Sequence, residues 1–492
     1  MQWEEEMCIV TGDNRAWKNP DGHKTAIELW CRSKNGHSTL LIVNGLRPYV
    51  EISDCRSVER IANEPLSINL ISGMHEVEDL ENIGEKLSQD GIQRTHYRVY
   101  VRDTRVVRSV RKRLSEYGWR VTSADVLFVQ RLMLDLDLGP HIEARGEVLW
   151  AGERAPADTK TELTTDSKIA TGRILEVGGS GIYPVDMILS CSISGLTRTD
   201  PFPAPFVTMS FDLETSIANN WILCAAAVID RAGERTEYRF RVDDESVGET
   251  DILEGLTDLV RKEDPDFITG YNIDNFDLPR IEERADAIAP RTKMDRVAML
   301  GWGRVPLIED EARQRRLFPS RQQNRVWQIA GRIPLDAWWQ ARQTLRPQRE
   351  SLRYVSRLLW GEEEGMQKMD IDASKMDEEW EARPEEVLEY CVRDAALPLD
   401  ILGKMKSIAR KEALASVSLT TVETASNSTT SRWIDSLVIR LADREGIAVP
   451  TTNTGPRKRD QIAGGYVHEV ESGMEPWVVV LDFKSMYPSI MI

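Results

Sequence analysis

The stretch FVTMSFDLETS, residues 206–216, decides the fold class, because its composition and periodicity predict a β-strand. WILCAAAVIDR (221–231) and EYRFRV (237–242) predict two more strands, and ETDILEGLTDLVRKED (249–264) has the apolar spacing of a helix. FITGYN (267–272) predicts a further strand. Strands interleaved with helices predict an α/β sheet in this part of the chain.

Three further helices are expected along the chain. FDLPRIEERADAIA (276–289) predicts the first, and the second is a long helix from Pro384 to Leu414, with proline at its first turn and a kink at Pro398. SRWIDSLVIRLADREG (431–446) predicts the third, closed by Gly446.

Length and composition favour a multidomain protein without a membrane span. The 492 residues suggest about three domains, and 41% hydrophobic residues suffice for large cores. No apolar run approaches the roughly 20 residues that cross a bilayer, and the acidic N-terminus does not resemble a signal peptide. The six cysteines are scattered without a CxxC pair, so we expect no disulfide framework or zinc site and a reducing, cytoplasmic location. The net charge of −17 argues only weakly against nucleic-acid binding and leaves room for metal-binding carboxylates.

The pattern along the chain predicts several parts. Short strand-like runs dominate the first part, and its one helix, Thr104–Tyr117, carries basic residues that form either a solvated face or a phosphate-facing stripe. A polar, Gly/Ser/Thr-rich stretch with weak strands follows and is taken as a connector or β insertion. The predicted parts are a β-rich domain (1–137), this connector (138–205), an α/β domain (206–405), a helical return segment (406–447) and a last segment (448–492) that includes a buried strand at 477–483.

Carboxylates recur on the elements of the α/β domain. Asp212 and Glu214 lie two apart on one strand and therefore point to the same face. Asp277 opens a helix, and Tyr390 and Asp394 lie four apart on another helix, hence on one face. Each pattern alone fits an ordinary strand end, helix cap or surface pair. Together they supply four carboxylates and a tyrosine, enough for two magnesium-type ions of the kind that assist phosphoryl displacement.

This ordered set resembles the three exonuclease motifs of family B DNA polymerases, archaeal type. The resemblance implies a ribonuclease-H-like 3′→5′ proofreading domain that takes two Mg²⁺ or Mn²⁺ ions. It implies that Asp212, Glu214, Asp277 and Asp394 are metal ligands or their neighbours, and that Tyr390 positions the nucleophilic water. Asn272 and Phe276 match the second motif and are expected to contact DNA. GRIPLDAWWQAR, which contains Asp336, also resembles a segment of this family.

The last residues resemble the first polymerase motif of the same family. In LDFKSMYPSI (481–490), the resemblance implies that Asp482 binds the catalytic metals and that Ser485, Met486 and Tyr487 line the nucleotide site. Met486 stands where leucine is usual. IAGGYV (462–467) resembles the Y-x-G-G hinge, so Gly464 and Gly465 are DNA-binding candidates, although Ile462 replaces the tyrosine.

The N-terminal part resembles the archaeal members' template-reading domain. GLRPYVEIS (45–53) and DVLFVQRLMLDLDLG (125–139) carry this resemblance. It makes Pro48, Val107, Phe128 and Arg131 candidates for a uracil-binding pocket. Ordinary core residues of a small β domain are the alternative.

The expected fold is thus a multidomain α/β and α+β protein with a β-rich N-terminal domain, a ribonuclease-H-like exonuclease domain and an incomplete palm. The expected function is that of the N-terminal part of a replicative DNA-directed DNA polymerase. Expected partners are primer-template and single-stranded DNA, dNTP in the completed enzyme, a C-terminal polymerase half and a sliding clamp, without a membrane, in the cytoplasm with the nucleoid.

Three origins of such a sequence stay open: a truncated record, half of a split enzyme, or a chain interrupted at an intein-like insertion point. Two other functions also stay open. One is a stand-alone 3′→5′ exonuclease with a vestigial palm strand, and the other is a non-catalytic DNA-binding module. A neighbouring gene that encodes the K-x-x-x-N-S-x-Y-G and D-T-D motifs would favour the split polymerase.

Overall fold

The predicted α/β sheet is present and has five strands in the order β13-β12-β11-β14-β17. In the computed structural model, β11 pairs antiparallel with β12 and parallel with β14, β12 pairs antiparallel with β13, and β14 pairs parallel with β17. The strands are β11 (Val207–Thr215), β12 (Ile222–Arg231), β13 (Glu234–Arg241), β14 (Phe267–Thr269) and β17 (Ile333–Pro334).

The structure describes residues 2–19, 22–54, 68–88, 90–151, 184–243, 247–288, 293–305, 315–321, 326–364, 371–451, 466, 468–469 and 472–492. It divides into two compact units, Met1–Thr451 and Thr452–Ile492. No helix in these described ranges is long and apolar enough to cross a membrane.

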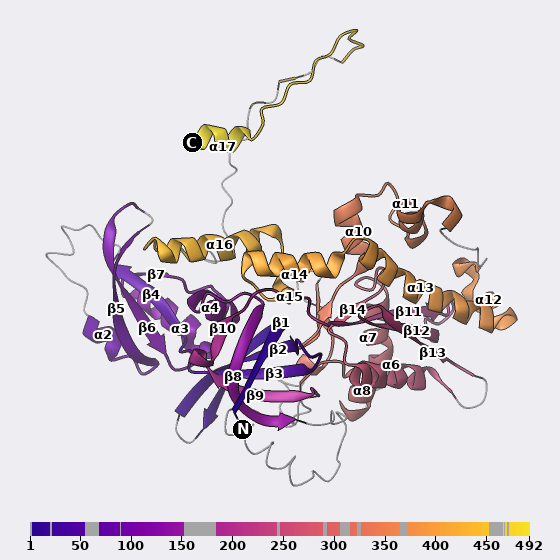
Figure 1. Cartoon of the computed structure of the whole chain (residues 1–492), viewed down its shortest axis with the longest axis horizontal. Helices are drawn as coiled ribbons and strands as arrows, with labels where there is room; N and C mark the ends of the chain where they lie inside the picture. Colours follow the sequence, from indigo (N-terminus) through magenta and orange to yellow (C-terminus); the bar gives the residue numbers. More distant parts are fainter. Residues whose placement is uncertain are drawn as a thin grey trace. The chain divides into compact units, whose positions relative to one another are not determined.

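Helices cover both faces of this sheet (Figure 1). On one face, Met209, Phe211 and Leu213 of β11 pack with apolar residues of three helices, α6 (Glu249–Glu263), α7 (Asp277–Ile288) and α8 (Lys293–Leu300). On the other face, Cys224 and Ala226 of β12 pack against α13 (Pro384–Lys404). Because Asp212 is paired with Ala226, the strand alternation turns Asp212 and Glu214 toward α13.

The N-terminal part contains two sheets. One has the order β1-β2-β3-β9-β8-β10, and β1 also pairs with β8, so this sheet closes on itself. Its strands are β1 (Gln2–Asn19), β2 (Gly22–Ser33), β3 (Ser38–Asn44), β8 (His141–Ala151), β9 (Met187–Ser192) and β10 (Leu196–Arg198). Strands β8, β9 and β10 lie within the predicted connector 138–205 but belong to this N-terminal sheet. The predicted domain boundary at residue 138 therefore does not coincide with the end of the sheet.

The second N-terminal sheet has the order β5-β6-β4-β7. A cluster that includes Val50, Val99 and Leu114 packs it against its helices. Its elements are β4 (Tyr49–Asp54), β5 (Val77–Leu87), β6 (Gln93–Val101), β7 (Trp119–Thr122), α2 (Ile68–Ser72) and α3 (Val107–Glu116).

The remaining elements of the first unit are short strands and helices that complete its surface. They are α4 (Phe128–Asp135), β15 (Ser320–Arg321), β16 (Trp327–Gln328), α10 (Ala337–Leu345), α11 (Leu352–Glu364), α12 (Met376–Ala382), α14 (Ser407–Ser418), α15 (Val422–Asn427) and α16 (Thr430–Arg444). α16 contacts the N-terminal part through Arg440, which donates to Asp137 at 2.7 Å, and Ser436, which accepts from Gln130 at 2.9 Å.

The prediction of one long helix from Pro384 to Leu414 is wrong. The chain forms two helices, α13 and α14, separated by Met405 and Lys406. Lys406 adopts a left-handed conformation, with φ of 52°, which a continuous right-handed helix does not allow.

The predicted buried strand at 477–483 is also wrong. The described part of the second unit has one helix, α17 (Met486–Met491), and no strand pairing at 477–483, where the side chains are exposed. A strand requires a hydrogen-bonded neighbour, and no described residues provide one here.

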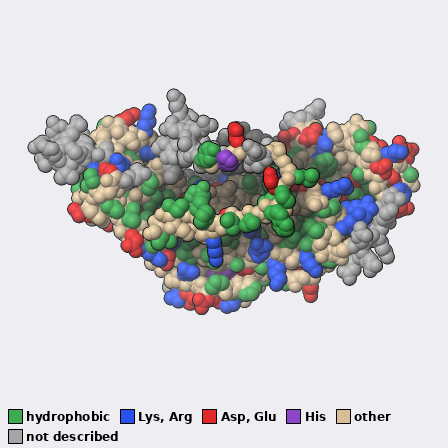
Figure 2. Space-filling view, turned by 90° about the horizontal axis from the view of Figure 1, so that it is seen from above, with side chains coloured by type: hydrophobic (Ala, Val, Ile, Leu, Met, Phe, Trp, Pro, Cys, Tyr) green, Lys and Arg blue, Asp and Glu red, His purple; other side chains and the backbone are tan. Residues whose placement is uncertain are grey.

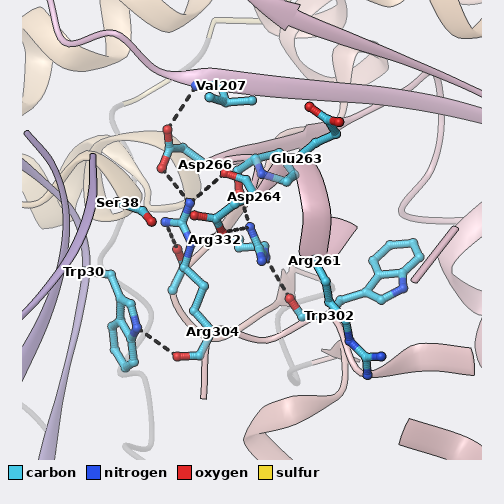
Figure 3. Close-up of polar contacts among 12 residues, drawn as sticks. Trp30, Ser38, Val207, Arg261, Glu263, Asp264, Asp266, Trp302, Arg304 and Arg332 are labelled. Carbon is cyan, nitrogen blue, oxygen red and sulfur yellow. Dashed lines mark hydrogen bonds and ion pairs between the residues drawn. The ribbon is translucent and has the colours of Figure 1, made fainter. Parts of the chain in front are cut away.

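A buried network of charged side chains joins the two sheets that carry β2 and β14 (Figure 3). Arg32 Nε of β2 lies 2.8 Å from Asp266 Oδ2, and Arg304 Nη2 lies 2.9 Å from Asp266 Oδ1. Arg304 Nε and Arg332 Nη1 each lie 2.7 Å from Asp264 Oδ1. All five side chains are at most 1% exposed, so each carboxylate is neutralised within the core.

Figure 2 views the molecule from above, with hydrophobic side chains of both units visible. On this side of the first unit, α16 exposes Ile434, Leu437, Val438 and Leu441. Their spacing places them on one side of the helix, so α16 presents an apolar stripe.

Candidate active site

The first two carboxylates come from β11. Asp212 and Glu214 alternate with the buried Phe211 and Leu213, so both point away from the α6–α8 face and toward α13. The Sγ atom of Cys391 on α13 donates to the backbone oxygen of Asp212 at 3.4 Å. This contact fixes α13 directly over the acidic end of β11, and both carboxylates keep partial exposure.

The third carboxylate, Asp277, is the first residue of α7 and is buried. The turn before it is held by Asp336, which accepts hydrogen bonds from the backbone N–H of Asn272 at 2.8 Å and of Asp274 at 3.2 Å. Asn272 has a φ of 70°, a left-handed conformation that asparagine tolerates better than most residues. Asp336 therefore positions the turn that directs Asp277 toward β11, where Asp277 accepts from the Leu213 N–H.

Tyr390 and Asp394 lie on one face of α13, as predicted from their spacing. The Tyr390 hydroxyl hydrogen-bonds to the Asp394 carboxylate. Burial and the nearby charge of Asp394 raise the pKa of Tyr390, so the phenol keeps its proton at neutral pH. The Asp394 Oδ1 atom is buried and has no hydrogen-bond partner, and the same is true of Asp277 Oδ1.

The carboxylates influence one another electrostatically. Burial, followed by the charges of Asp277, Glu214 and Asp394, raises the pKa of Asp212 well above its ordinary range. Burial and the charges of Asp394 and Asp277 raise the pKa of Glu214 to about 8. Burial and the charge of Asp336 raise the pKa of Asp277 to about 8, and burial raises that of Asp394 to about 6. The site therefore favours either bound protons or a bound cation.

The donor set fits divalent cations of the magnesium type. The carboxylates of Asp212, Glu214, Asp277 and Asp394 are hard oxygen ligands, and two of their oxygens are buried without a partner. In the described part of the chain, none of the four forms an ion pair with lysine or arginine. They are not a tight group, since no three of them bring ligand atoms within 4.8 Å of one another.

Two exposed aromatic side chains lie in turns next to the elements that carry the carboxylates. Phe276, directly before Asp277, is 41% exposed, and Arg280 lies over its ring at 5.8 Å. Trp221, in the turn between β11 and β12, is 54% exposed, with Arg284 of α7 over its ring at 5.9 Å. Trp221 was not among the predicted site residues. The signal available in the sequence was a tryptophan that opens a strand seven residues after Glu214.

A further acidic residue near this turn was also not predicted. Asp274 is buried, and burial together with the charge of Asp336 raises its pKa to about 7. Its backbone oxygen accepts from Trp327 Nε1 at 2.9 Å. Because Asp274 lies between Asn272 and Asp277, the sequence motif contained it, but only its buried environment distinguishes it from a turn residue.

The polymerase-motif residues lie in the second unit. Asp482, Ser485, Met486 and Tyr487 are all exposed, and no described residue of that unit encloses them. Gly464 and Gly465 lie outside the described residues. Their predicted roles in metal, nucleotide and DNA binding stay predictions.

The uracil-pocket candidates belong to two different cores. Val107 packs against the cluster of the β5-β6-β4-β7 sheet, and Phe128 packs against the cluster of the β1–β8 sheet. Pro48 is buried and accepts from the Val101 N–H at 2.8 Å. Arg131 is buried beneath Tyr49, 5.0 Å from its ring centroid, and its Nη1 lies 3.6 Å from Asp135. Their predicted role as a template-reading pocket stays a prediction.

A sheet of this order, with acidic residues on β11, α7 and α13, defines the ribonuclease-H-like exonuclease fold. The family model "DNA polymerase family B, exonuclease domain" matches residues 165–355, which include Asp212, Glu214 and Asp277. A second model, "DNA polymerase type B, organellar and viral", matches residues 331–492, which include Tyr390, Asp394 and Asp482. Models of family B DNA polymerases thus match residues 165–492 of this chain between them.

Relatives from eukaryotes and archaea agree with this assignment. The DNA polymerase delta catalytic subunit of Mesocricetus auratus is 29% identical over 420 residues, which cover 77% of this chain and 35% of the relative. DNA polymerase 1 of Pyrococcus abyssi is 29% identical over 252 residues, 50% of this chain and 30% of the relative. The chain thus spans about a third of the length of these relatives.

A solved structure shows the same fold. The family B DNA polymerase of the archaeon Pyrobaculum calidifontis superposes with a TM-score of 0.64 at 18% identity, over 92% of this chain and 52% of the solved chain. The match covers both the N-terminal β-rich part and the exonuclease domain, so the predicted multidomain α/β and α+β fold is confirmed.

Proposed function

We propose that this chain removes nucleotides from the 3′ end of DNA by two-metal phosphodiester hydrolysis. The observation that carries the proposal is the group of four carboxylates on β11, α7 and α13, for which no ion pair with lysine or arginine is found among the described residues and which has two buried oxygens without hydrogen bonds. Such a group supports a cation-dependent reaction.

The residues have separate tasks in this proposal. Asp212, Glu214, Asp277 and Asp394 hold the ions, which when bound supply charge stabilisation and lower the pKa of a water molecule. Tyr390 keeps its proton and, held by Asp394, orients the attacking water. The water oxygen bonds to phosphorus as the bond to the 3′ oxygen breaks, and the released proton neutralises that oxygen. The products are a nucleoside 5′-monophosphate and a DNA strand shortened by one nucleotide.

Substrate contacts are proposed for the aromatic border of the site. Phe276 and Trp221 are exposed beside α7, and aromatic faces stack on bases of single-stranded DNA without selecting a sequence. Asn272, in the turn before Phe276, is the proposed polar contact with the primer end. A proofreading site requires this kind of contact, because its substrate is a separated strand of any sequence.

The decisive experiment follows the digestion of a 5′-labelled single-stranded oligonucleotide. We expect products that shorten from the 3′ end with Mg²⁺ or Mn²⁺ and no digestion with a chelator. Asp394→Asn should reduce the rate nearly to background, because an amide cannot supply the charge. Asp400→Asn is the matched control, since Asp400 lies on the same helix but faces Arg235 at 2.7 Å. Wild-type digestion by Asp394→Asn contradicts the proposal.

We also propose that Asp482 takes part in nucleotidyl transfer, together with a polypeptide that supplies the second palm carboxylate and the triphosphate-binding lysine. The support is the match of the last residues to the polymerase family model. One carboxylate does not hold two ions in the geometry of an in-line displacement. Primer extension by this chain mixed with such a polypeptide should be lost with Asp482→Ala, and extension that survives the change contradicts the role.

A further inference from the structure

Outside the nuclease site, three possible metal ligands from distant parts of the chain come together. Cys8 Sγ, a ring nitrogen of His141 and a carboxylate oxygen of Glu412 lie within 4.8 Å of one another. Cys8 on β1 and His141 on β8 are direct cross-strand partners, so their side chains share a face. Glu412 reaches this pair from α14. Among the described residues, no other set of three potential ligands is as close.

The histidine is already held in the orientation that a metal ligand needs. His141 Nε2 lies 3.0 Å from Glu412 Oε1, and His141 Nδ1 lies 3.3 Å from Ser416 Oγ. The Ser416 hydroxyl donates to the Glu412 backbone oxygen at 3.1 Å, so its oxygen is free to accept from an Nδ1 proton. With the proton on Nδ1, the lone pair of His141 Nε2 faces the Glu412 carboxylate and the Cys8 sulfur. A hydrogen bond to the far nitrogen is the usual support of a metal-bound histidine.

We propose that Cys8, His141 and Glu412 bind a Zn²⁺ ion. Sulfur, imidazole and carboxylate together are a donor set typical of zinc and unlike the all-oxygen sets of Mg²⁺. Zinc–ligand bonds of about 2.0–2.3 Å in a tetrahedron place ligand atoms roughly 3.3–3.6 Å apart. The His141–Glu412 separation of 3.0 Å is close to this, and the sulfur needs to approach by no more than about 1.5 Å.

Binding is balanced by proton release. The Cys8 side chain is fully buried, and burial, followed by the nearby Glu412 charge, raises the pKa of its thiol. Zn²⁺ replaces the thiol proton, which leaves to solvent, and the thiolate and the carboxylate then neutralise the ion. The Glu412 side chain is partly exposed to solvent, and a water molecule would complete the fourth position.

The position gives such an ion a structural role close to the nuclease site. Glu412 Oε1 also accepts from the Ala204 N–H at 3.1 Å, and the His141 ring packs edge-on against Phe202 at 4.8 Å. These two residues belong to the segment that leads directly into β11, which carries Asp212. A zinc ion would therefore tie β1, β8 and α14 to the start of the catalytic strand.

The test uses the full chain with Asp212→Ala and Glu214→Ala, so that zinc cannot remain at the nuclease site. After removal of metal and dialysis with zinc, metal analysis should find about one zinc ion per chain. Cobalt in place of zinc should produce the thiolate-to-metal charge-transfer absorption that only a cysteine ligand gives. Chains that retain no zinc, or a cobalt complex without this absorption, overturn the proposal.

Variants separate ligands from neighbours. Cys8→Ser, His141→Gln and Glu412→Gln should each weaken zinc binding by more than the roughly 10- to 100-fold that loss of an outer-shell partner costs. Ser416→Ala should weaken binding by about 10- to 100-fold, because the histidine loses its orienting partner. Cys31→Ser is the matched control, a buried cysteine on the neighbouring strand β2, and should bind zinc as the parent chain does. Unchanged zinc affinity and an unchanged cobalt spectrum in Cys8→Ser overturn the proposal even if another variant fails to fold.

Discussion

Two clusters of charged side chains near the same five-stranded sheet differ in how their charge is balanced. Asp264 and Asp266 meet three arginines, and Asp266 Oδ2 also accepts from the Val207 N–H at 3.0 Å. Asp212 and Glu214 on β11 meet only other carboxylates. The charges of the first cluster are balanced within the polypeptide, whereas those of the second require bound protons or a cation from solution.

The titration behaviour follows this difference. Burial lowers the pKa of Arg332 to about 9 but leaves it charged at neutral pH beside Asp264. Burial and repulsion raise the pKa of Glu214 to about 8, so part of its population holds a proton at neutral pH. The buried arginines are permanent counter-charges that stabilise the fold. A cluster whose counter-charge comes from solution can instead bind and release ions. The comparison therefore supports a stabilising role for the first cluster and the proposed cation-dependent chemistry for the second.

The largest expected effect is on activity, from Asp212→Ala combined with Glu214→Ala. We expect at least a roughly 10³-fold loss of 3′→5′ digestion, because charge stabilisation of the displacement is lost. The free energy of unfolding without metal should not fall, since the change removes repulsion between like charges. The measurements are digestion of end-labelled DNA and denaturant unfolding.

The matched control for that pair is Glu234→Ala with Glu237→Ala, two acidic residues on β13, the edge strand of the same sheet, that face solvent. It should retain wild-type digestion. A large loss of unfolding free energy in the Asp212/Glu214 variant would show that these carboxylates stabilise the fold as Asp264 and Asp266 do. The proposed difference between the two clusters would then be wrong.

The second effect is on stability, from Asp264→Asn. Asparagine tolerates the left-handed conformation at this position, where φ is 48°, so the change removes mainly the charge. Removing one partner of a buried ion pair costs about 3–5 kcal/mol of unfolding free energy. Denaturant unfolding measures this, with the exposed Asp258→Asn on α6 as control. If the unfolding free energy falls no more than in the control, the buried arginines do not need the charge of Asp264 for stability.

A smaller effect is expected for Tyr390→Phe. This change removes the hydroxyl that hydrogen-bonds to Asp394 but no metal ligand, so a roughly 10²-fold loss of the digestion rate is expected. The concentration of Mg²⁺ that gives half-maximal rate should stay near the wild-type value. A large rise in that concentration would assign Tyr390 to ion binding instead of water positioning.

The smallest effect is the increment in stability from Mg²⁺, which adds to a larger pH dependence of stability without metal. The folded-state pKa values of Glu214 and Asp277, about 8, lie above the unfolded values near 4, so the folded chain binds more protons between them. Stability should therefore fall as pH rises from about 5 to 8. Mg²⁺ at ten times its dissociation constant should restore about 1.4 kcal/mol at pH 8.

Thermal unfolding with and without Mg²⁺ measures this effect. The Asp212/Glu214 double variant should show a flatter pH profile and a smaller Mg²⁺ increment. If Mg²⁺ stabilises the double variant as much as the wild-type chain, the ion binds at a site other than Asp212 and Glu214.

Much of the site was predictable from local sequence, because the relevant geometry has short range. A strand period of two residues placed Asp212 and Glu214 on one face, and a helical spacing of four placed Tyr390 beside Asp394. The predicted strands and helices between residues 206 and 288 are present. The local pattern gave a wrong prediction where strand formation depends on a neighbouring strand. The apolar run 477–483 has no paired strand among the described residues.

The sequence by itself determined the strands, the helices and the acidic motifs, since these depend on residues a few positions apart. Only the tertiary structure decided that α13 covers the acidic face of β11, that Asp336 holds the turn before Asp277, and that arginines neutralise Asp264 and Asp266. It also decided the position of Cys8 beside His141 and Glu412, although the scattered cysteines predicted no zinc site. Strand register and helix packing bring these residues together, and such long-range contacts leave no periodic signal in a single sequence.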